Sequence, residues 1–183
     1  MTRNTANIVL IGMPGSGKST VGVILAKETA MGFVDTDLSI QTAQGRTLQD
    51  ILDGDGHMAL REIEEKILLG LELKNHVIAT GGSAVYSTAA MEHLKRNGIF
   101  VFLKVDLPTI RARVDNFDTR GIAKRPDQTM EELFQERHEL YSRYADITID
   151  GRDLPQEVAC RAILKSIDVH AGFPDPKSCA AIL

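Results

Sequence analysis

The sequence is short of the features that mark several protein classes. Net charge is −4, so there is no basic field to favour nucleic acid or an anionic membrane. The two cysteines, Cys160 and Cys179, lack metal-ligand spacing and fit a reducing compartment. No apolar run approaches the ~18 residues of a membrane helix. The apolar run near the N-terminus is too short for a signal peptide. A cytoplasmic protein is therefore expected, with no membrane and no nucleic-acid partner. A monomer is also expected, although none of these features determines the oligomeric state.

What is present is an alternation of strand and helix patterns. Short β-branched runs bounded by turn residues predict five strands, over residues 7–11, 33–36, 76–80, 99–105 and 147–150. Periodic apolar segments between them predict helices. This alternation predicts an α/β fold, a parallel sheet with helices on both faces, whose ligands bind beyond the carboxyl ends of the strands. One domain is expected over residues 1–168, followed by a loose or surface-docked tail over 169–183.

A phosphate-binding loop lies between the first strand and the first helix. Gly12, Gly17, Lys18 and Ser19 satisfy the pattern G-x-x-x-x-G-K-[ST] in the context that the motif requires. The glycines let backbone N–H groups turn toward a polyphosphate, and the helix N-terminus adds positive charge. Lys18 is expected on the β- and γ-phosphates and the Ser19 hydroxyl on Mg²⁺. The residues expected to bind ATP here are Gly12, Gly15, Ser16, Gly17, Lys18, Ser19 and Thr20. Thr20 is expected to pack or cap rather than to ligate the metal.

Two aspartates follow the second strand. Asp35 and Asp37 are two residues apart, which places both carboxylates on one face of an extended chain. One could help to hold Mg²⁺, and the other could accept a proton from an attacking hydroxyl. Asp106, at the end of the most apolar strand, is the rival metal ligand. It also has the pattern of a helix N-cap with proline just inside the helix, so Asp35 is preferred.

Several motifs in a fixed order give the sequence a specific resemblance. "GMPGSGKST", "DTD", "LREIEE", "TGGS" and "ERHELYSRYAD" occur in that order over about residues 7–168. The chain resembles the shikimate kinase family, small P-loop kinases that have a five-stranded parallel sheet, a mobile lid and an architecture similar to that of nucleoside-monophosphate kinases. The resemblance implies ATP as co-substrate, Mg²⁺ as cofactor, a small hydroxy acid as acceptor and a place in aromatic amino acid biosynthesis.

The resemblance also implies roles for individual residues. Asp37 would be the proposed base, and Asp35 would lie near Mg²⁺. Arg61 and Arg137 would hold the substrate carboxylate, which matches the planar fork of arginine. Backbone donors would come from Gly81 and Gly82. The remaining roles would belong to Arg120, as the lid arginine that closes over the transferred phosphoryl group, and to Arg113 and Pro155, as the pair that sandwiches adenine.

The residues by themselves leave simpler explanations open. Arg61 could form a surface salt bridge with Glu64 or Glu65 on the same helix, and Arg137 could pair with the glutamates 131, 132 or 136 or be solvated. Gly81 and Gly82 could form a plain strand-to-helix turn. The lid, predicted over about residues 116–127, is polar and rich in turn-forming residues, as a solvated loop would also be.

The sequence departs from the common family pattern near the acceptor and the lid. Ser83 replaces a third glycine, His57 follows Gly56 where Gly-Glu is common, and Leu60 replaces phenylalanine. Residues 121–123 read Gly-Ile-Ala where Pro-Leu-Leu is common. The phosphoryl-transfer residues are intact. We therefore expect a Mg·ATP-dependent kinase that phosphorylates shikimate, with a relative acting on another acceptor such as homoserine, or a non-catalytic nucleotide-binding module, as alternatives.

Overall fold

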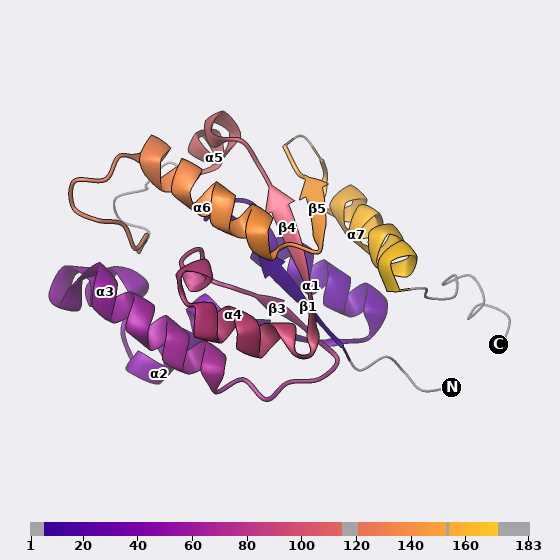
Figure 1. Cartoon of the computed structure of the whole chain (residues 1–183), viewed down its shortest axis with the longest axis horizontal. Helices are drawn as coiled ribbons and strands as arrows, with labels where there is room; N and C mark the ends of the chain where they lie inside the picture. Colours follow the sequence, from indigo (N-terminus) through magenta and orange to yellow (C-terminus); the bar gives the residue numbers. More distant parts are fainter. Residues whose placement is uncertain (1–5, 115–120, 153, 172–183) are drawn as a thin grey trace, which may run out of the picture.

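The chain folds around one five-stranded parallel sheet (Figure 1). This computed structural model describes residues 6–114, 121–152 and 154–171. The strands lie in the order β2-β3-β1-β4-β5, and every neighbouring pair is parallel. The strand bounds are β1 Asn7–Ile11, β2 Gly32–Asp35, β3 His76–Ala79, β4 Gly98–Lys104 and β5 Ile147–Asp150.

Helices cover both faces of the sheet (Figure 1). One face carries α1 and α7, which pack against each other, and the other carries the end of α3 together with α4 and α6. The helix bounds are α1 Lys18–Thr29, α2 Thr36–Gln44, α3 Leu48–Leu69, α4 Thr88–Lys95, α5 Leu107–Arg113, α6 Met130–Tyr144 and α7 Gln156–Ala171, with the 3-10 helix η1 at Ala84–Tyr86.

The predicted fold class and all five predicted strands are confirmed, with small differences at their ends. The expected strand over residues 33–36 ends one residue early, because Asp35 caps α2 and Thr36 is already its first residue. The strand expected over 99–105 begins and ends one residue earlier, at Gly98 and Lys104. Helix α7 continues to Ala171, three residues past Asp168, where the domain was expected to end. Residues 172–183 lie outside the described part of the chain.

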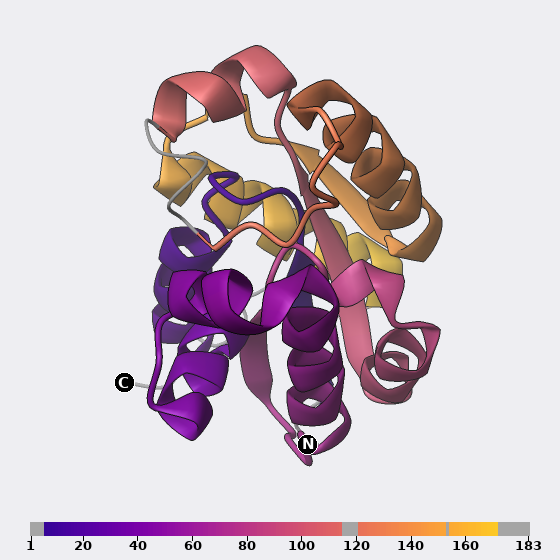
Figure 2. The same cartoon turned by 90° about the vertical axis from the view of Figure 1, so that its left-hand side faces the viewer.

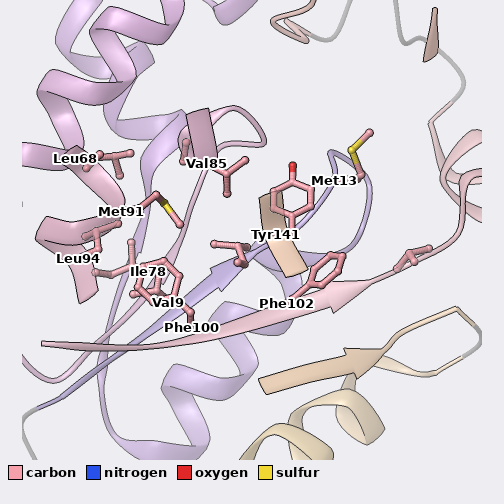
Figure 3. Packing of buried hydrophobic residues seen from close by; sticks show 14 of the residues in the cluster. Val9, Met13, Leu68, Ile78, Val85, Met91, Leu94, Phe100, Phe102 and Tyr141 are labelled. Carbon is pink, nitrogen blue, oxygen red and sulfur yellow. The ribbon is translucent and has the colours of Figure 1, made fainter. Parts of the chain in front are cut away.

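Two apolar cores hold the layers together. Between the sheet and α3, α4 and α6, side chains such as Val9, Ile78, Phe100 and Met91 belong to one buried cluster with Tyr141, which is fully buried (Figure 3). On the other face, α1 and α7 enclose a second cluster that includes Cys160. Cys160 is fully buried, as its place on the apolar side of the last helix predicted. Burial of both sheet faces explains why the strands are nearly continuous apolar runs.

Helix α3 bends at a point that affects the site. Thr47 caps its N-terminus in a reciprocal capping box with Asp50. Gly56 then interrupts the helix with φ +84° and ψ 172°, a conformation open to glycine. The second half of α3, which carries Arg61 and Glu64, is thereby re-aimed relative to the first half.

The topology gathers the sequence motifs at one end of the sheet. The loop before α1 follows β1, the two aspartates follow β2, and the Gly-Gly-Ser segment follows β3. In a parallel sheet the carboxyl ends of neighbouring strands meet at one edge, and ligands bind there. Figure 2 looks onto this end of the molecule, where the segment after residue 120 crosses between α3 and the loop before α1.

Candidate active site

The loop before α1 has the backbone of an anion cradle. Gly12, Gly15 and Gly17 have φ values of +147°, +81° and +95°, a region that side chains rarely adopt. A β-carbon on Gly12 would also lie 2.8 Å from the carbonyl oxygen of Leu103. The motif glycines are therefore required by the turn itself. The loop leads directly into the N-terminus of α1, where backbone N–H groups and the helix dipole favour an anion.

The ammonium group of Lys18 lies inside this loop. Its Nζ donates hydrogen bonds of 2.9 Å to the carbonyl oxygens of Gly12 and Met13, and the residue is 8% exposed. Burial lowers the pKa of Lys18 to about 8, although the carboxylates of Asp37 and Asp35 act in the opposite direction. The ammonium group is thus held by the loop's own carbonyls at the place where phosphate oxygens would compete for it.

Ser19 and Asp35 bring their oxygens together at the mouth of the loop. The Ser19 hydroxyl donates to Asp35 Oδ2 at 2.6 Å, while Asp35 Oδ1 accepts from the backbone N–H groups of Asp37 and Leu38. Asp35 therefore joins the first turn of α2 to the phosphate loop. A hydroxyl and a carboxylate in contact are the hard oxygen ligands that Mg²⁺ prefers.

Asp106 has the other role that its sequence pattern suggested. Its carboxylate accepts from the backbone N–H of Thr109 at 2.9 Å and caps α5, with Pro108 in the first turn. The capping hydrogen bonds are the main cause of a lowered pKa at Asp106. This geometry makes Asp106 a structural cap, while Asp35 is the carboxylate beside Ser19.

A cavity of about 370 Å³ opens from the phosphate loop toward α3 and α6. It joins the expected nucleotide and acceptor residues in one space. Its lining includes Lys18, Ser19 and Thr20 from α1, Asp37 from α2, Glu64 from α3, Gly82 and Ser83 after β3, Arg113 from α5, Ile122 and Ala123, and Arg137 from α6. Most of the residues expected to bind ATP or acceptor therefore lie around one cavity.

Glu64 is a functional candidate that the sequence reasoning treated only as a salt-bridge partner. It is 2% exposed, its Oε2 accepts from the Ser83 hydroxyl at 2.5 Å, and its Oε1 is buried with no partner among the described residues. Burial first, and then the charge of Asp37, raise the pKa of Glu64 to about 7. The signal in the sequence was its position on the buried face of α3, three residues after Arg61.

The two glycines after β3 lie beside this carboxylate. A β-carbon on Gly81 would collide with Glu64 Oε1 and lie 2.5 Å from Asp37 Oδ1, so the two acidic side chains converge on Gly81. The Gly81 N–H donates to Thr36 Oγ1 at 2.9 Å. The Gly81 N–H is therefore engaged within the ligand-free protein, and its role as a backbone donor to substrate stays a prediction. Gly82 lines the cavity, and its carbonyl accepts from the Tyr141 hydroxyl.

Arg137 is fully buried rather than paired with the acidic residues of its own helix. It is 1% exposed, and its Nη2 donates to the carbonyl oxygen of Ala123 at 2.6 Å. Its Nε is buried with no partner among the described residues. The neighbouring glutamates have other partners, since Glu131 contacts Arg111 and Glu136 contacts Arg125. The surface explanation for Arg137 is therefore wrong.

Arg61 does not form the salt bridge that the simpler explanation required. Its Cζ lies 3.6 Å from the centre of the Tyr86 ring, and its Nε and Nη2 are buried with no partner among the described residues. Glu65 instead accepts from the Ser87 hydroxyl. Arg61 borders a second cavity of about 210 Å³, and within the described chain it is absent from the lining of the first. Glu64 and Ser83 border both cavities.

Of the two residues expected to sandwich adenine, Arg113 borders the main cavity and Pro155 does not. Arg113 borders the main cavity and donates to the carbonyl oxygens of Gly151 and Arg152, at 3.2 and 2.7 Å. Pro155 is exposed, while its neighbours Leu154 and Gln156 line a small space together with Arg113. The loop after β5 thus approaches Arg113, and Leu154 is the apolar side chain at that point.

The family model and the most similar relatives agree on one family. The family model described as shikimate kinase matches residues 14–168. A shikimate kinase of Rhizobium meliloti (strain 1021) is 31% identical over 92% of this chain and 89% of the relative, and one of Sulfurihydrogenibium sp. (strain YO3AOP1) is 36% identical over 87% and 96%. A shikimate kinase from Acinetobacter baumannii, solved in complex with shikimate, superimposes with a TM-score of 0.79 at 30% identity, covering 89% of this chain and 93% of that one.

The chain belongs to the shikimate kinase family. It is accordingly a phosphotransferase that acts on a hydroxyl group with ATP as co-substrate. Against the common shikimate kinase pattern, its own residues have identifiable structural effects. Ser83 adds the hydroxyl that donates to Glu64, and Leu60 of α3 is buried in a cluster with Ile40 of α2 and Ala123.

Some expected features fall outside the described residues or have no counterpart within them. Arg120, the expected lid arginine, and residues 116–119 of the predicted lid lie outside the described residues. Over residues 6–114, 121–152 and 154–171, no helix is both long and apolar enough to cross a membrane. The same residues contain no cluster of three or more histidine, cysteine or acidic side chains arranged to hold a metal ion.

Proposed function

We propose that the chain transfers the γ-phosphoryl group of ATP to a hydroxyl of shikimate, with Mg²⁺ as cofactor. The observation that carries this proposal is the set of unpaired donors on the two arginines. Arg61 Nε and Nη2 and Arg137 Nε are buried, and none has a partner among the described residues. An unpaired buried N–H costs about 1–3 kcal/mol and calls for an explanation. A carboxylate is the group that satisfies several guanidinium donors at once, so the acceptor is an acid.

Asp37 is proposed to accept the proton of the reacting hydroxyl. It borders the cavity beside the phosphate loop, and its charge raises the pKa of both Lys18 and Glu64. Glu64 Oε1, which lies with Asp37 Oδ1 beside Gly81, is buried with no partner among the described residues and would take a second hydroxyl of the acceptor. This pairing supports an acceptor that carries adjacent hydroxyl groups as well as a carboxylate.

The phosphates would be held by the loop before α1. Its backbone cradle and the α1 N-terminus suit polyphosphate, and Lys18 would exchange the carbonyls of Gly12 and Met13 for phosphate oxygens. Arg120, from the lid, is proposed to add a positive charge beside the transferred phosphoryl group. Arg113 is proposed to bind adenine. Ser19 and Asp35 fit Mg²⁺ because they offer two hard oxygen ligands and leave places for water and phosphate. When bound, Mg²⁺ would neutralise charge that develops on the phosphates.

The proposal is tested by coupled ADP release with a panel of acceptors. The panel contains shikimate, quinate, homoserine and gluconate, each with Mg·ATP, and Lys18→Ala measures contaminating kinase. Shikimate is expected to stimulate ADP release in the wild type and not in the variant. Stimulation by another acceptor alone would overturn the substrate, and a lack of stimulation by every acceptor would overturn the kinase assignment in favour of a nucleotide-binding module.

Homoserine is the second candidate, and one observation favours it. Asp37 and Glu64 converge beside Gly81, and two carboxylates would also suit the ammonium group of an amino acid. The arginines would bind the carboxylate of either acceptor equally well. The panel separates these candidates, because shikimate has no ammonium group and homoserine has no adjacent hydroxyls.

A further inference from the structure

One aromatic ring lies beside both arginines of the proposed carboxylate site. Tyr86 ends the short helix η1, directly after the Gly-Gly-Ser segment. The Cζ atom of Arg61 lies 3.6 Å from the centre of its ring, and the Cζ atom of Arg137 lies 5.5 Å away. Both distances are within the range of about 6 Å in which a cation is attracted to the face of an aromatic ring.

The Tyr86 ring offsets part of the repulsion between the two guanidinium charges. Burial lowers the pKa of Arg61, and the nearby charge of Arg137 lowers it further, so the two guanidinium groups oppose each other. The negative face of an aromatic ring offsets part of this cost. A ring contact also leaves N–H donors unused, and three of these donors are buried without a partner among the described residues. A carboxylate in this position, in place of the ring, would saturate the same donors.

The ring is itself held by rigid parts of the fold. Its neighbours in η1, Ala84 and Val85, are buried in the core beneath α4 and α6. Ser87, the next residue, caps α4 through the backbone N–H of Ala90 and bonds Glu65 on α3. Tyr86 thus stands on an anchored segment between α3, which carries Arg61, and α6, which carries Arg137.

We propose that Tyr86 is a positioning residue for the acceptor carboxylate. Its ring holds Arg61 next to Arg137, with the unpaired donors of both arginines kept available for one anionic group. This inference rests on the proposed function, because it assigns the two arginines to an acidic acceptor.

The test is steady-state kinetics of Tyr86→Leu with shikimate and ATP. Loss of the ring is expected to raise the KM for shikimate by about 3- to 30-fold, the value of one or two cation–π contacts. Because the arginines bind a part of the acceptor that does not react, kcat and the KM for ATP should change by less than about twofold. Tyr86→Phe, which keeps the ring, should restore the KM for shikimate to within about twofold of the wild-type value.

Two further variants complete the test. Lys95→Met removes a cation that lies 5.2 Å from the Phe100 ring and pairs with Asp146, away from the site, and serves as a control for loss of a cation–ring contact elsewhere. In the double variant Arg61→Ala/Tyr86→Leu, the two effects on KM should be much less than multiplicative, since the ring acts through the arginine. Unchanged KM in Tyr86→Leu, or fully multiplicative effects, would overturn the inference. Unchanged KM in Arg61→Ala would instead overturn the acidic acceptor in the proposed function.

Discussion

At the scale of single residues, Lys18 is the side chain whose place is most tightly determined. It is buried within the phosphate loop and bonded to two of the loop's carbonyls. Lys18→Ala is expected to lower kcat by at least ~10²-fold, because a cation is removed from the charge that develops on the transferred phosphoryl group. The measurement is coupled ADP release, with Lys27→Ala, an exposed lysine of the same helix, as the control. Turnover near that of the wild type would contradict the role of Lys18.

The role of Asp37 can be distinguished from that of Asp35 by replacing each aspartate with asparagine, which has nearly the same shape. Asp37→Asn is expected to lower kcat by ~10²-fold or more while the affinity for ATP is nearly unchanged, because asparagine cannot accept the proton. Asp35→Asn should instead weaken the binding of Mg·ATP, since Asp35 contacts Ser19. Nucleotide titration and turnover measured for both variants test this division. The opposite pattern would exchange the two roles.

Glu64 gives a prediction about stability and pH. Its folded pKa is raised from 4.5 to about 7, so between these values the folded protein keeps a proton that the unfolded chain releases. The contribution of Glu64 to the free energy of unfolding is therefore fully present below pH 4.5 and is lost as the pH rises through about 7. The wild type should lose up to about 3 kcal/mol of unfolding free energy over this window relative to Glu64→Gln, which does not titrate.

Denaturant unfolding of the ligand-free protein at several pH values between about 4.5 and 8 measures this difference. Glu62→Gln, an exposed neighbour on α3, is the control and should show a difference from the wild type that does not grow with pH. A constant difference between the wild type and Glu64→Gln would show that Glu64 is not protonated in the folded state at neutral pH.

The residues that could be predicted from the sequence are those whose chemistry depends on local spacing. The phosphate loop, the Asp35–Asp37 pair and the Asp106 cap all follow from positions a few residues apart. Tyr86 and the Glu64–Ser83 pair could not be predicted in the same way, because their contacts join segments that are about 20 or more residues apart. The packing of α3 against η1 and α6 determines them, and periodicity does not specify such packing.

At the scale of elements, the strands were predictable and the details of the helices were less so. Buried parallel strands are short β-branched runs with clear ends, and all five were found within one or two residues of their predicted limits. The bend of α3 at Gly56 was missed, since a single glycine in a helical pattern does not reveal its φ angle.

The segment Gly121–Ala123 is the element most open to test. Gly121 has φ +70°, and its N–H donates to Gln49 Oε1 at 2.9 Å. A β-carbon there would collide with Leu48. Ile122 and Ala123 are buried after it, so Gly121→Ala is expected to detach this segment from α3 and raise the KM for the acceptor.

Gly45 provides a matched control for this substitution. It has φ +62°, but no heavy atom lies within 4 Å of the position that a β-carbon would take. Gly45→Ala therefore introduces the same backbone strain, about 1 kcal/mol, without the collision. Thermal unfolding should show a larger loss of Tm for Gly121→Ala than for Gly45→Ala, and only Gly121→Ala should alter the KM. Equal effects of the two variants would mean that the contact with Leu48 has no role in the site.

At the scale of the whole molecule, the sequence predicted a parallel sheet but not the order of its strands. Alternating strands and helices require crossover connections, and these fix the handedness of each crossover but not which strands become neighbours. The observed order places β1 between β3 and β4. The phosphate loop after β1 therefore adjoins the Gly-Gly-Ser segment after β3, and donor and acceptor residues share one cavity.

The hydrogen bond between Arg137 and the carbonyl oxygen of Ala123 has a consequence for the affinity with which an acid binds. The carbonyl occupies Nη2, whereas Nε is the unpaired donor, so we expect an acid that needs both nitrogens to compete with the carbonyl and to bind in full only the form whose Nη2 is vacant. The observed dissociation constant then equals the intrinsic constant divided by the vacant fraction. For a charge-assisted hydrogen bond worth about 1.5–3 kcal/mol, this weakens observed affinity by roughly 10- to 150-fold. Saturating acceptor should accordingly release the Ala123 segment and change hydrogen exchange at residues 122 and 123.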